Sequence, residues 1–187
     1  MEPAKRPATY QDVLDAPDHL VAEVIAGELY TSPRPAAPHT RAASVLGMDI
    51  GGAFDRGRGG PGGWIILDEP ELHLGEDILV PDLAGWRRAR LPEVGDAAYF
   101  ELAPDWACEV LSPSTGLLDR RRKLPVYARE GVGHVWLVDP RQRSVEVFRL
   151  DGESYRFIVA EGADVVARLE PFDAIELDLS ALWTNTG

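Results

Sequence analysis

Two acidic side chains, Asp82 and Glu109, stand where their neighbours in the sequence predict burial. Asp82 follows Pro81 in "ILVPDLAGW", directly after the apolar run 78–80, which indicates a buried strand ending before a proline that cannot donate to a sheet ladder. Glu109 lies inside the apolar segment "WACEVL". Burying a carboxylate without a partner costs several kcal/mol or forces it to accept a proton. We therefore expect the two acids to lie on neighbouring strands and to share a compensating group.

The strand that carries Glu109 is expected to be covered on both faces. Alternation along residues 106–111 places Glu109 on the same face as Ala107 and Leu111, and it puts the three remaining side chains on the other face. Since both sets are mostly apolar, neither face is expected to meet water.

A divalent cation would supply the compensation that the two acids need. Carboxylate oxygens select hard ions, and Mg²⁺, or Mn²⁺ in its place, accepts two protein carboxylates completed by water and a substrate phosphate. Such an ion polarises the phosphate, activates a water and stabilises the leaving oxygen. The pair therefore indicates metal-assisted chemistry on a phosphate.

Two other readings use the same residue types. A glycosidase could also use a pair of carboxylates such as Asp82 and Glu109, although no run of aromatic residues marks a sugar-binding cleft. Zinc ligation by histidine is poorly supported because the histidines are scattered and show no paired spacing. They are His19, His39, His73 and His134.

Lysine is rare in this chain, and its position is informative. Of the 19 Lys and Arg residues, only Lys5 and Lys123 are lysines, and Lys123 follows three arginines in "DRRRK" at 119–123. Lys is a compact charge whose pKa responds to burial, whereas Arg is bulky and permanently protonated. A site that must place one positive group against a phosphate oxygen or an attacking water favours Lys, so Lys123 is a candidate. Asp119, four residues earlier, is explained by default as its helix partner.

The length and charge of the chain limit which other classes of function it could have. The 187 residues, 45% hydrophobic and 27% charged, suit one globular domain spanning residues 1–187. The net charge of -12 argues against binding nucleic acid through the overall field. The charges are segregated, however, because the stretch 64–82 holds six acids and no Lys or Arg, whereas 86–90 and 119–123 are basic. We expect a local basic strip beside an acidic centre, with ordinary solvated charged faces as the alternative.

The compartment is expected to be the cytoplasm. No segment approaches the roughly 20 apolar residues of a membrane-spanning helix, and no apolar run follows the charged start of the chain. The single cysteine, Cys108, excludes an internal disulfide and a thiolate metal cluster, and its neighbours suggest a small buried hydrophobe.

Local patterns predict strands in the middle of the chain with two substantial helices between them. A hairpin with its turn at Ala26 and Gly27 and a helix that Pro125 kinks or divides are the features closest to the candidate residues. In chain order we expect a short helix over 8–16, a hairpin over 21–33, a helix over 39–57, two or three strands over 64–86, a strand within 104–114, a helix over 117–131, a strand over 134–139, a hairpin over 144–159, and a closing strand and short helix over 174–183.

Three segments, "VPDLAGW", "WACEVLSPST" and "DRRRKLPVYAREGVGHVWLVDP", together resemble the PD-(D/E)XK nuclease superfamily, and within it the bacterial branch of putative restriction endonucleases of the Uma type. The likeness runs from about residue 10 to residue 182, which would be the core of the single domain. It implies a restriction-endonuclease-like α/β fold, with a mixed β-sheet flanked by helices and additional hairpins. It also implies Asp82 and Glu109 as ligands of Mg²⁺ or Mn²⁺ and endonucleolytic hydrolysis of DNA phosphodiester bonds.

The chain departs from the superfamily pattern at the third signature residue. A lysine should stand two residues after the glutamate, but Leu111 occupies that place. The branch is expected to carry the lysine on the next helix instead, which again selects Lys123.

The N-terminal hairpin "AEVIAGELY" also resembles the branch, and superfamily sites often recruit an additional acid from this part of the chain. Across the turn, Ile25 should pair with Glu28 and Glu23 with Tyr30, which puts both glutamates on one face. Glu23 is the candidate supplementary acid, and an exposed charge on a hairpin edge is the alternative. His39, which opens the following helix, either touches substrate or caps a turn.

DNA is the implied substrate, but no motif that reads a base sequence is visible, and RNA stays open. Cutting both strands of a duplex would be easiest for a homodimer, for which the C-terminal strands are candidates. The alternative class is a nuclease fold that has lost catalysis and serves as a binding or assembly module, which the net charge of -12 favours. The arginines expected to guide substrate phosphates are Arg87, Arg88, Arg120, Arg121 and Arg122.

Overall fold

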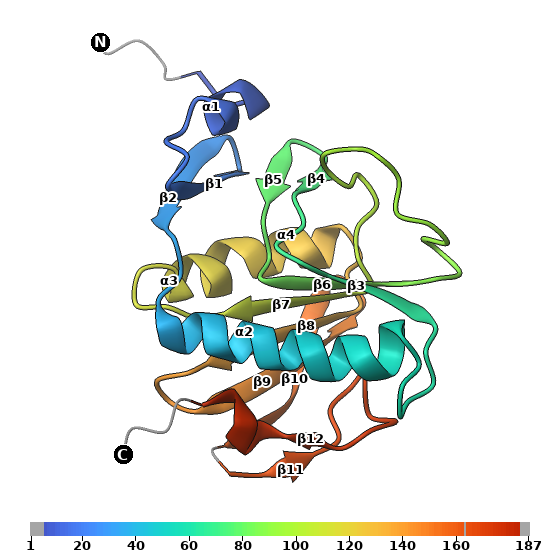
Figure 1. Cartoon of the computed structure of the whole chain (residues 1–187). Helices are drawn as coiled ribbons and strands as arrows, with labels where there is room; N and C mark the ends of the chain where they lie inside the picture. The colour runs from blue at the N-terminus through green and yellow to red at the C-terminus, as the bar shows by residue number, and fades with distance from the viewer. Residues whose placement is uncertain (1–5, 163, 184–187) are drawn as a thin grey trace.

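A six-stranded mixed sheet forms the centre of the molecule (Figure 1). The computed structural model describes residues 6–162 and 164–183. Strand order in this sheet is β10-β9-β8-β7-β6-β3, and β7 and β8 run parallel whereas the other neighbours are antiparallel. The strands are β3 (Trp64–Asp68), β6 (Leu83–Arg87), β7 (Trp106–Val110), β8 (His134–Asp139), β9 (Ser144–Asp151) and β10 (Ser154–Gly162).

A second, antiparallel sheet has the order β2-β1-β5-β4, and the short helix α1 (Tyr10–Leu14) precedes it in the chain. Its strands are β1 (Leu20–Ile25), β2 (Glu28–Pro33), β4 (Leu72–Leu74) and β5 (Asp77–Leu79). Two short strands near the C-terminus, β11 (Val166–Ala167) and β12 (Leu177–Asp178), pair with each other, and the 3₁₀ turn η3 (Leu179–Leu182) follows.

Helices cover both faces of the central sheet (Figure 1). On one face lies α2 (Ala37–Ile50), which continues into the π-helical turn η1 (Gly51–Asp55). On the other face lie α3 (Gly116–Leu118), the π-helical turn η2 (Asp119–Lys123) and α4 (Leu124–Arg129). Pro125 is the second residue of α4, directly after the π-helical turn η2, and the backbone remains helical across Lys123 and Leu124, so the helix changes its hydrogen-bond pattern before the proline without being divided. None of the helices in the described residues is both long and apolar enough to cross a membrane.

The core is divided in two by the central sheet, as the alternation along β7 predicts. Trp106, Cys108 and Val110 belong to the cluster under α2, whereas Ala107 and Leu111 belong to the cluster under α4. Every residue of β7 is buried. The expectation that both faces of this strand are covered is therefore confirmed, and Glu109 is forced into the interior with its neighbours.

The predicted hairpin register is confirmed, since Ile25 pairs with Glu28 and Glu23 pairs with Tyr30. The alternative reading of Glu23 as an exposed edge charge is wrong. β5 adds to the free side of β1, and Glu23 is only 4% exposed.

The segment 64–86 forms four strands instead of the two or three expected, and these divide between the two large sheets. β4 and β5 belong to the smaller sheet, whereas β3 and β6 belong to the central one. Asp82 lies where the chain crosses between the sheets, between the end of β5 and the start of β6. This crossing explains why an acid follows a buried strand, because Asp82 lies in the connection that leads into β6 and is not part of β5.

We predict that Gly60→Ala lowers the free energy of unfolding by about 1–3 kcal/mol, because the loop between η1 and β3 folds back onto η1 too closely for a side chain. A Cβ at Gly60 would lie 2.6 Å from Ala53 Cβ and 2.8 Å from the Ala53 carbonyl oxygen. The matched control is Gly95→Ala, where a Cβ meets nothing within 4 Å and a change within about 0.5 kcal/mol is expected. Urea denaturation measures both, and equal effects would contradict the prediction.

Candidate active site

Lys123 is a buried ammonium surrounded by three carboxylates. Its Nζ lies 2.9 Å from Glu23 Oε1, 3.1 Å from Glu109 Oε2 and 3.3 Å from Asp119 Oδ1. All four residues are buried, with exposed fractions of 2–4%. Burial of this kind demands charge compensation, because an unpaired ion in the interior would cost several kcal/mol.

Three separate elements bring these four side chains together. Glu109 comes from β7 in the central sheet, Glu23 from β1 in the smaller sheet, and Asp119 and Lys123 from the π-helical turn η2. Asp119 and Lys123 are four residues apart and form the helix pair that their spacing predicts. The Lys123 ammonium thereby joins both large sheets to the helical layer.

Both oxygens of Glu109 are held. Tyr127, one turn after Lys123 and fully buried, donates a hydrogen bond from its hydroxyl to Glu109 Oε1 at 2.5 Å, while Lys123 donates to Oε2. A carboxylate has about four lone-pair sites, so each oxygen keeps a further one for another ligand. Tyr127 and Lys123 fix the orientation of the Glu109 carboxylate without using up its capacity to bind.

Burial dominates the electrostatics of the cluster. It raises the pKa of the Glu109 carboxyl well above its ordinary value, which Lys123 opposes and the acids around it reinforce. Burial also raises the pKa of Asp119, against the effect of Lys123. For Lys123 itself burial alone would lower the pKa, but Glu109, Glu23 and Asp119 raise it well above the ordinary value. Lys123 is therefore charged at neutral pH.

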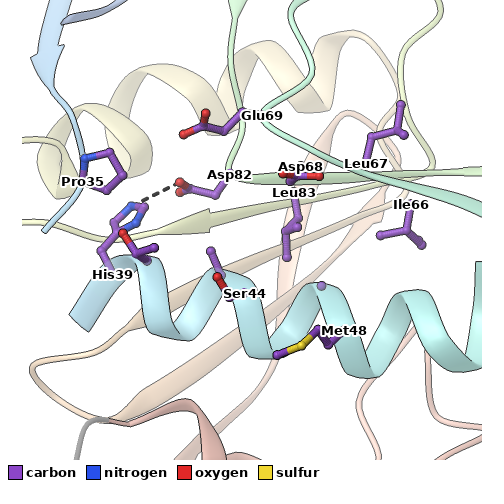
Figure 2. Close-up of a pocket in the computed structure, with 13 residues that line it drawn as sticks. Pro35, His39, Ser44, Met48, Ile66, Leu67, Asp68, Glu69, Asp82 and Leu83 are labelled. Atoms are coloured by element: carbon purple, nitrogen blue, oxygen red, sulfur yellow. Dashed lines mark ion pairs between the residues drawn. The ribbon is translucent and has the colours of Figure 1, made fainter. Parts of the chain in front are cut away.

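Asp82 lies beside this cluster and is bound to the strand of Glu109. Its Oδ2 accepts a hydrogen bond from the backbone N–H of Val110 at 2.7 Å, and its Oδ1 lies 3.2 Å from His39 Nε2 (Figure 2). Although burial lowers the pKa of His39, the hydrogen bond and charge of Asp82 outweigh that effect and raise it. The side chain of Asp82 is 15% exposed, so it joins the buried cluster to the surface.

All of these carboxylates face one cavity, which we call the central cavity and which has a volume of about 190 Å³. It extends past Ser32 and Ser114 and ends against His39 at the start of α2. The members of the cluster that line it are Glu23, Asp82, Glu109, Asp119 and Lys123.

The structure brings five of the predicted site residues together and leaves several others apart. Asp82, Glu109, Lys123, Glu23 and His39 all line the central cavity. None of the five predicted arginines lines this cavity.

Arg87 lies at the far end of β6 from Asp82, about 16 Å away along the strand, with its guanidinium over the Trp64 ring. Arg88 pairs with Asp55. Arg120 makes a double hydrogen bond to Glu146 and is not among the residues of the central cavity. Of the predicted arginines, Arg121 and Arg122 line a neighbouring cavity that shares Ser32 and Ser114 with the central one. Arg34, which is not among the predicted residues, lines the central cavity itself.

Two residues of the cluster were not among the predicted site residues. Asp119 makes the helix pair with Lys123 that is expected of it, but it is also buried, at 2% exposed, and its Oδ1 accepts no well-aligned hydrogen bond within the described residues. Tyr127 had no signal beyond its place four residues after Lys123, which puts both on one helix face.

The donor set fits a hard divalent cation held by two carboxylates. Three acids against one ammonium leave a formal charge of -2 when all are ionised, and Asp82 adds to it. The acids supply carboxylate oxygens, which such ions prefer. Within the described residues, no group of three or more His, Cys, Asp or Glu side chains could hold a metal ion by itself. The fit is therefore to an ion such as Mg²⁺, which keeps several waters and takes few protein ligands.

The chain matches a family model in sequence and a solved structure in fold, and both are described as putative nucleases. A family model described as "Uma2: Putative restriction endonuclease" matches residues 7–180. A crystal structure described as a putative nuclease belonging to DUF820 from Anabaena variabilis ATCC 29413 superposes with a TM-score of 0.73 at 22% identity, covering 94% of this chain and 97% of the other. The expected restriction-endonuclease-like α/β fold is thereby confirmed. Among curated proteins, none matches this chain.

We predict that Lys123→Met destabilises the protein by about 3–5 kcal/mol at about pH 8 and by less at about pH 5. The folded-state pKa values of Glu109 and Asp119 are raised, so each carboxyl supports the folded state at low pH and loses that contribution as pH rises through its folded pKa. Without the ammonium both values rise further, which steepens the loss.

Urea denaturation at the two pH values checks this prediction. Arg121→Met is the matched control, because Arg121 stands two residues earlier and is exposed. A destabilisation by Lys123→Met that does not depend on pH would show that the effect is one of packing alone.

Proposed function

This chain belongs to the Uma2 family of putative restriction endonucleases, and from that premise we propose that it is a divalent-metal-dependent endonuclease that hydrolyses phosphodiester bonds of DNA. The observation that carries the proposal is the convergence of Asp82, Glu109 and Lys123 on one cavity, with the ammonium held against the glutamate. Restriction-endonuclease-like nucleases generally use divalent metals, and the carboxylate-rich donor set described above suits one.

Asp82 and Glu109 are the residues that would hold the ion. When bound, Mg²⁺ or Mn²⁺ supplies a Lewis acid for the scissile phosphate and lowers the pKa of the attacking water. The excess negative charge of the cluster attracts such a cation. The Val110 N–H fixes one oxygen of Asp82, which leaves the other to face the cavity beside His39.

Lys123 keeps its positive charge beside Glu109 throughout the proposed hydrolysis. Glu23 and Asp119 keep the ammonium charged and in place, and the backbone N–H of Val80 fixes Glu23 by donating to the same oxygen that Lys123 contacts. This arrangement offsets part of the negative charge that develops as the phosphate is attacked. Glu23 and Asp119 are positioning residues in this scheme, because they act through Lys123.

The phosphates of the substrate strand would enter past Arg121 and Arg122. These residues, with Leu117, Tyr30 and their neighbours, line what we call the basic cavity, with a volume of about 420 Å³. It shares Ser32 and Ser114 with the central cavity, so a strand held there leads directly to the carboxylates. Binding of this kind weakens steeply with salt.

A second candidate function, a nuclease fold without catalysis that serves as a binding module, is favoured by one observation. Both oxygens of Glu109 already accept hydrogen bonds, and Lys123 partly supplies the positive charge that a metal would bring. A measurement of metal binding distinguishes the two functions, because a catalytic site binds Mn²⁺ through Asp82 and a purely structural cluster does not.

We predict metal-dependent nicking of plasmid DNA that falls at least about 100-fold in Asp82→Asn, because this change removes a ligand charge without altering size. The assay compares Mg²⁺, Mn²⁺ and EDTA on single- and double-stranded DNA. Asp96→Asn, in the exposed loop between β6 and β7, is the matched control and should cleave like the unaltered chain. Isothermal titration with Mn²⁺ provides a readout besides activity, and equal Mn²⁺ binding by both variants would refute Asp82 as a ligand.

We predict that Tyr127→Phe weakens Mn²⁺ binding by about 10–100-fold, because Glu109 loses the hydrogen bond that orients it. Tyr155→Phe is the matched control, since its partly buried side chain also donates one hydrogen bond, from its hydroxyl to the Val132 carbonyl oxygen at 2.6 Å, and Tyr155 does not line the cavity. Both variants should lower the melting temperature. Only Tyr127→Phe should reduce the further stabilisation caused by Mn²⁺, and equal reductions would assign Tyr127 a purely structural role.

A further inference from the structure

A second, larger cavity opens from the central one along the exposed face of α2. It has a volume of about 580 Å³ and lies between α2 and the strands β3 and β6 (Figure 2). We call it the side cavity. It shares Pro35, His39, Glu69 and Asp82 with the central cavity, so whatever occupies it lies next to the proposed metal ligand. Its volume falls within the range of about 300–1,000 Å³ typical of small-molecule sites.

The lining of the side cavity is unsuited to a phosphate. None of the thirteen described residues that line it is Lys or Arg, and three of them are acids, Asp68, Glu69 and Asp82. Like charge repels a phosphate, so the backbone of a nucleic acid must pass elsewhere. The basic cavity, which adjoins the central cavity at Ser32 and Ser114, offers that path through Arg121 and Arg122.

The same lining suits an uncharged, flat group with hydrogen-bond donors. Ala43, Gly47 and Leu83 provide an apolar wall, and Met48, 63% exposed, lies on the helix beside it (Figure 2). A thioether adapts to irregular apolar partners. The carboxylates of Asp68 and Glu69 accept hydrogen bonds and cannot donate them when ionised.

Glu69 stands at the junction of the two cavities in an unusual backbone conformation. Its φ is 45°, in the left-handed region that a glutamate rarely adopts, and its N–H donates to the carbonyl oxygen of Asp82. Its Oε2 lies 3.7 Å from Nη1 of Arg34, a residue that also lines the central cavity. The strain thus holds an acceptor over the passage between the side and central cavities.

From this geometry we infer that the side cavity binds one unpaired nucleoside of the nucleic-acid substrate, next to the phosphate that is cut. Bases with an exocyclic amino group, which are cytosine, adenine and guanine, match its carboxylate acceptors, whereas thymine offers only a ring N–H. The inference rests on the proposed function and deepens it: the preferred substrate is a strand with an unpaired nucleotide at the cleavage position. A fully paired duplex must first open there, which costs free energy.

The chain contains two methionines, Met1 and Met48, so methyl-labelled methionine gives a reporter inside the cavity. The Met48 signal is assigned by comparison with Met48→Leu. We expect deoxycytidine and deoxyadenosine to shift this signal with a Kd of about 1 mM, and thymidine to bind about fivefold more weakly. Deoxyribose 5-phosphate should cause no shift. No shift of Met48 with any nucleoside, or equal shifts with the sugar phosphate, overturns the inference.

Two sets of variants sharpen the test. Ser44→Phe fills the cavity from the exposed face of α2 and should abolish the shifts, whereas Ser44→Ala, which adds no bulk, should keep them. The double variant Asp68→Asn, Glu69→Gln should bind all three nucleosides alike, because amides donate as well as accept. Retained cytosine preference in this double variant would overturn the assignment of the carboxylates.

Cleavage provides a separate arm that distinguishes the two proposals. A duplex with one unpaired cytosine should be cut at least about tenfold faster than the fully paired duplex, and Ser44→Phe should remove that difference. Cleavage without any Met48 shift overturns the nucleoside site and leaves the nuclease function standing. A Met48 shift in a protein that cuts no nucleic acid supports the nucleoside site and refutes the nuclease function.

Discussion

The ammonium of Lys123 inside a ring of buried carboxylates is the interaction on which the rest of the site depends. Glu23, Glu109 and Asp119 could not remain in the interior together without it, since each would have to be protonated or exposed. The hydrogen bond from Tyr127 to Glu109 is a second support of the same kind. Replacing such a cluster by apolar residues would often stabilise a protein, so its presence in the middle of a well-packed core is weak evidence of a contribution to stability.

The two large sheets and the helical layer of η2 and α4 meet at this cluster. Glu109 arrives on a central strand covered on both faces, Glu23 on a strand of the second sheet, and Lys123 on the helix that packs below both. The crossing of the chain from one sheet to the other places Asp82 at their junction, and α2 brings His39 against it. The side chains of the site therefore come from several separate elements, and the packing between layers, rather than any one loop, holds them in place.

Local regularities explain which features could be predicted from the sequence. The alternation along β7 and the two-residue turn of the N-terminal hairpin follow rules that operate within a few residues, so the faces around Glu109 and the pairing of Glu23 with Tyr30 are correct. The burial of Glu23 depends on β5, which lies more than fifty residues away and whose addition to β1 no local pattern indicates. The contacts of Asp119 and Tyr127, and the remote position of Arg87 at the other end of its strand, depend likewise on how distant elements pack.

The acidity of this chain is compatible with a nucleic-acid substrate because the two signs of charge are segregated around the site. Excess negative charge in the central cavity attracts a divalent cation at the point where chemistry is proposed, and screening limits the reach of the remaining surface charge to about 10 Å. Arg121 and Arg122 line the basic cavity, whereas Asp68 and Glu69 line the side cavity, and these two cavities adjoin the central one at different residues. A strand that crosses the site would thus meet cations where its phosphates lie and acceptors where its bases turn inward. Local arrangement, and not net charge, sets the orientation in which such a substrate can bind.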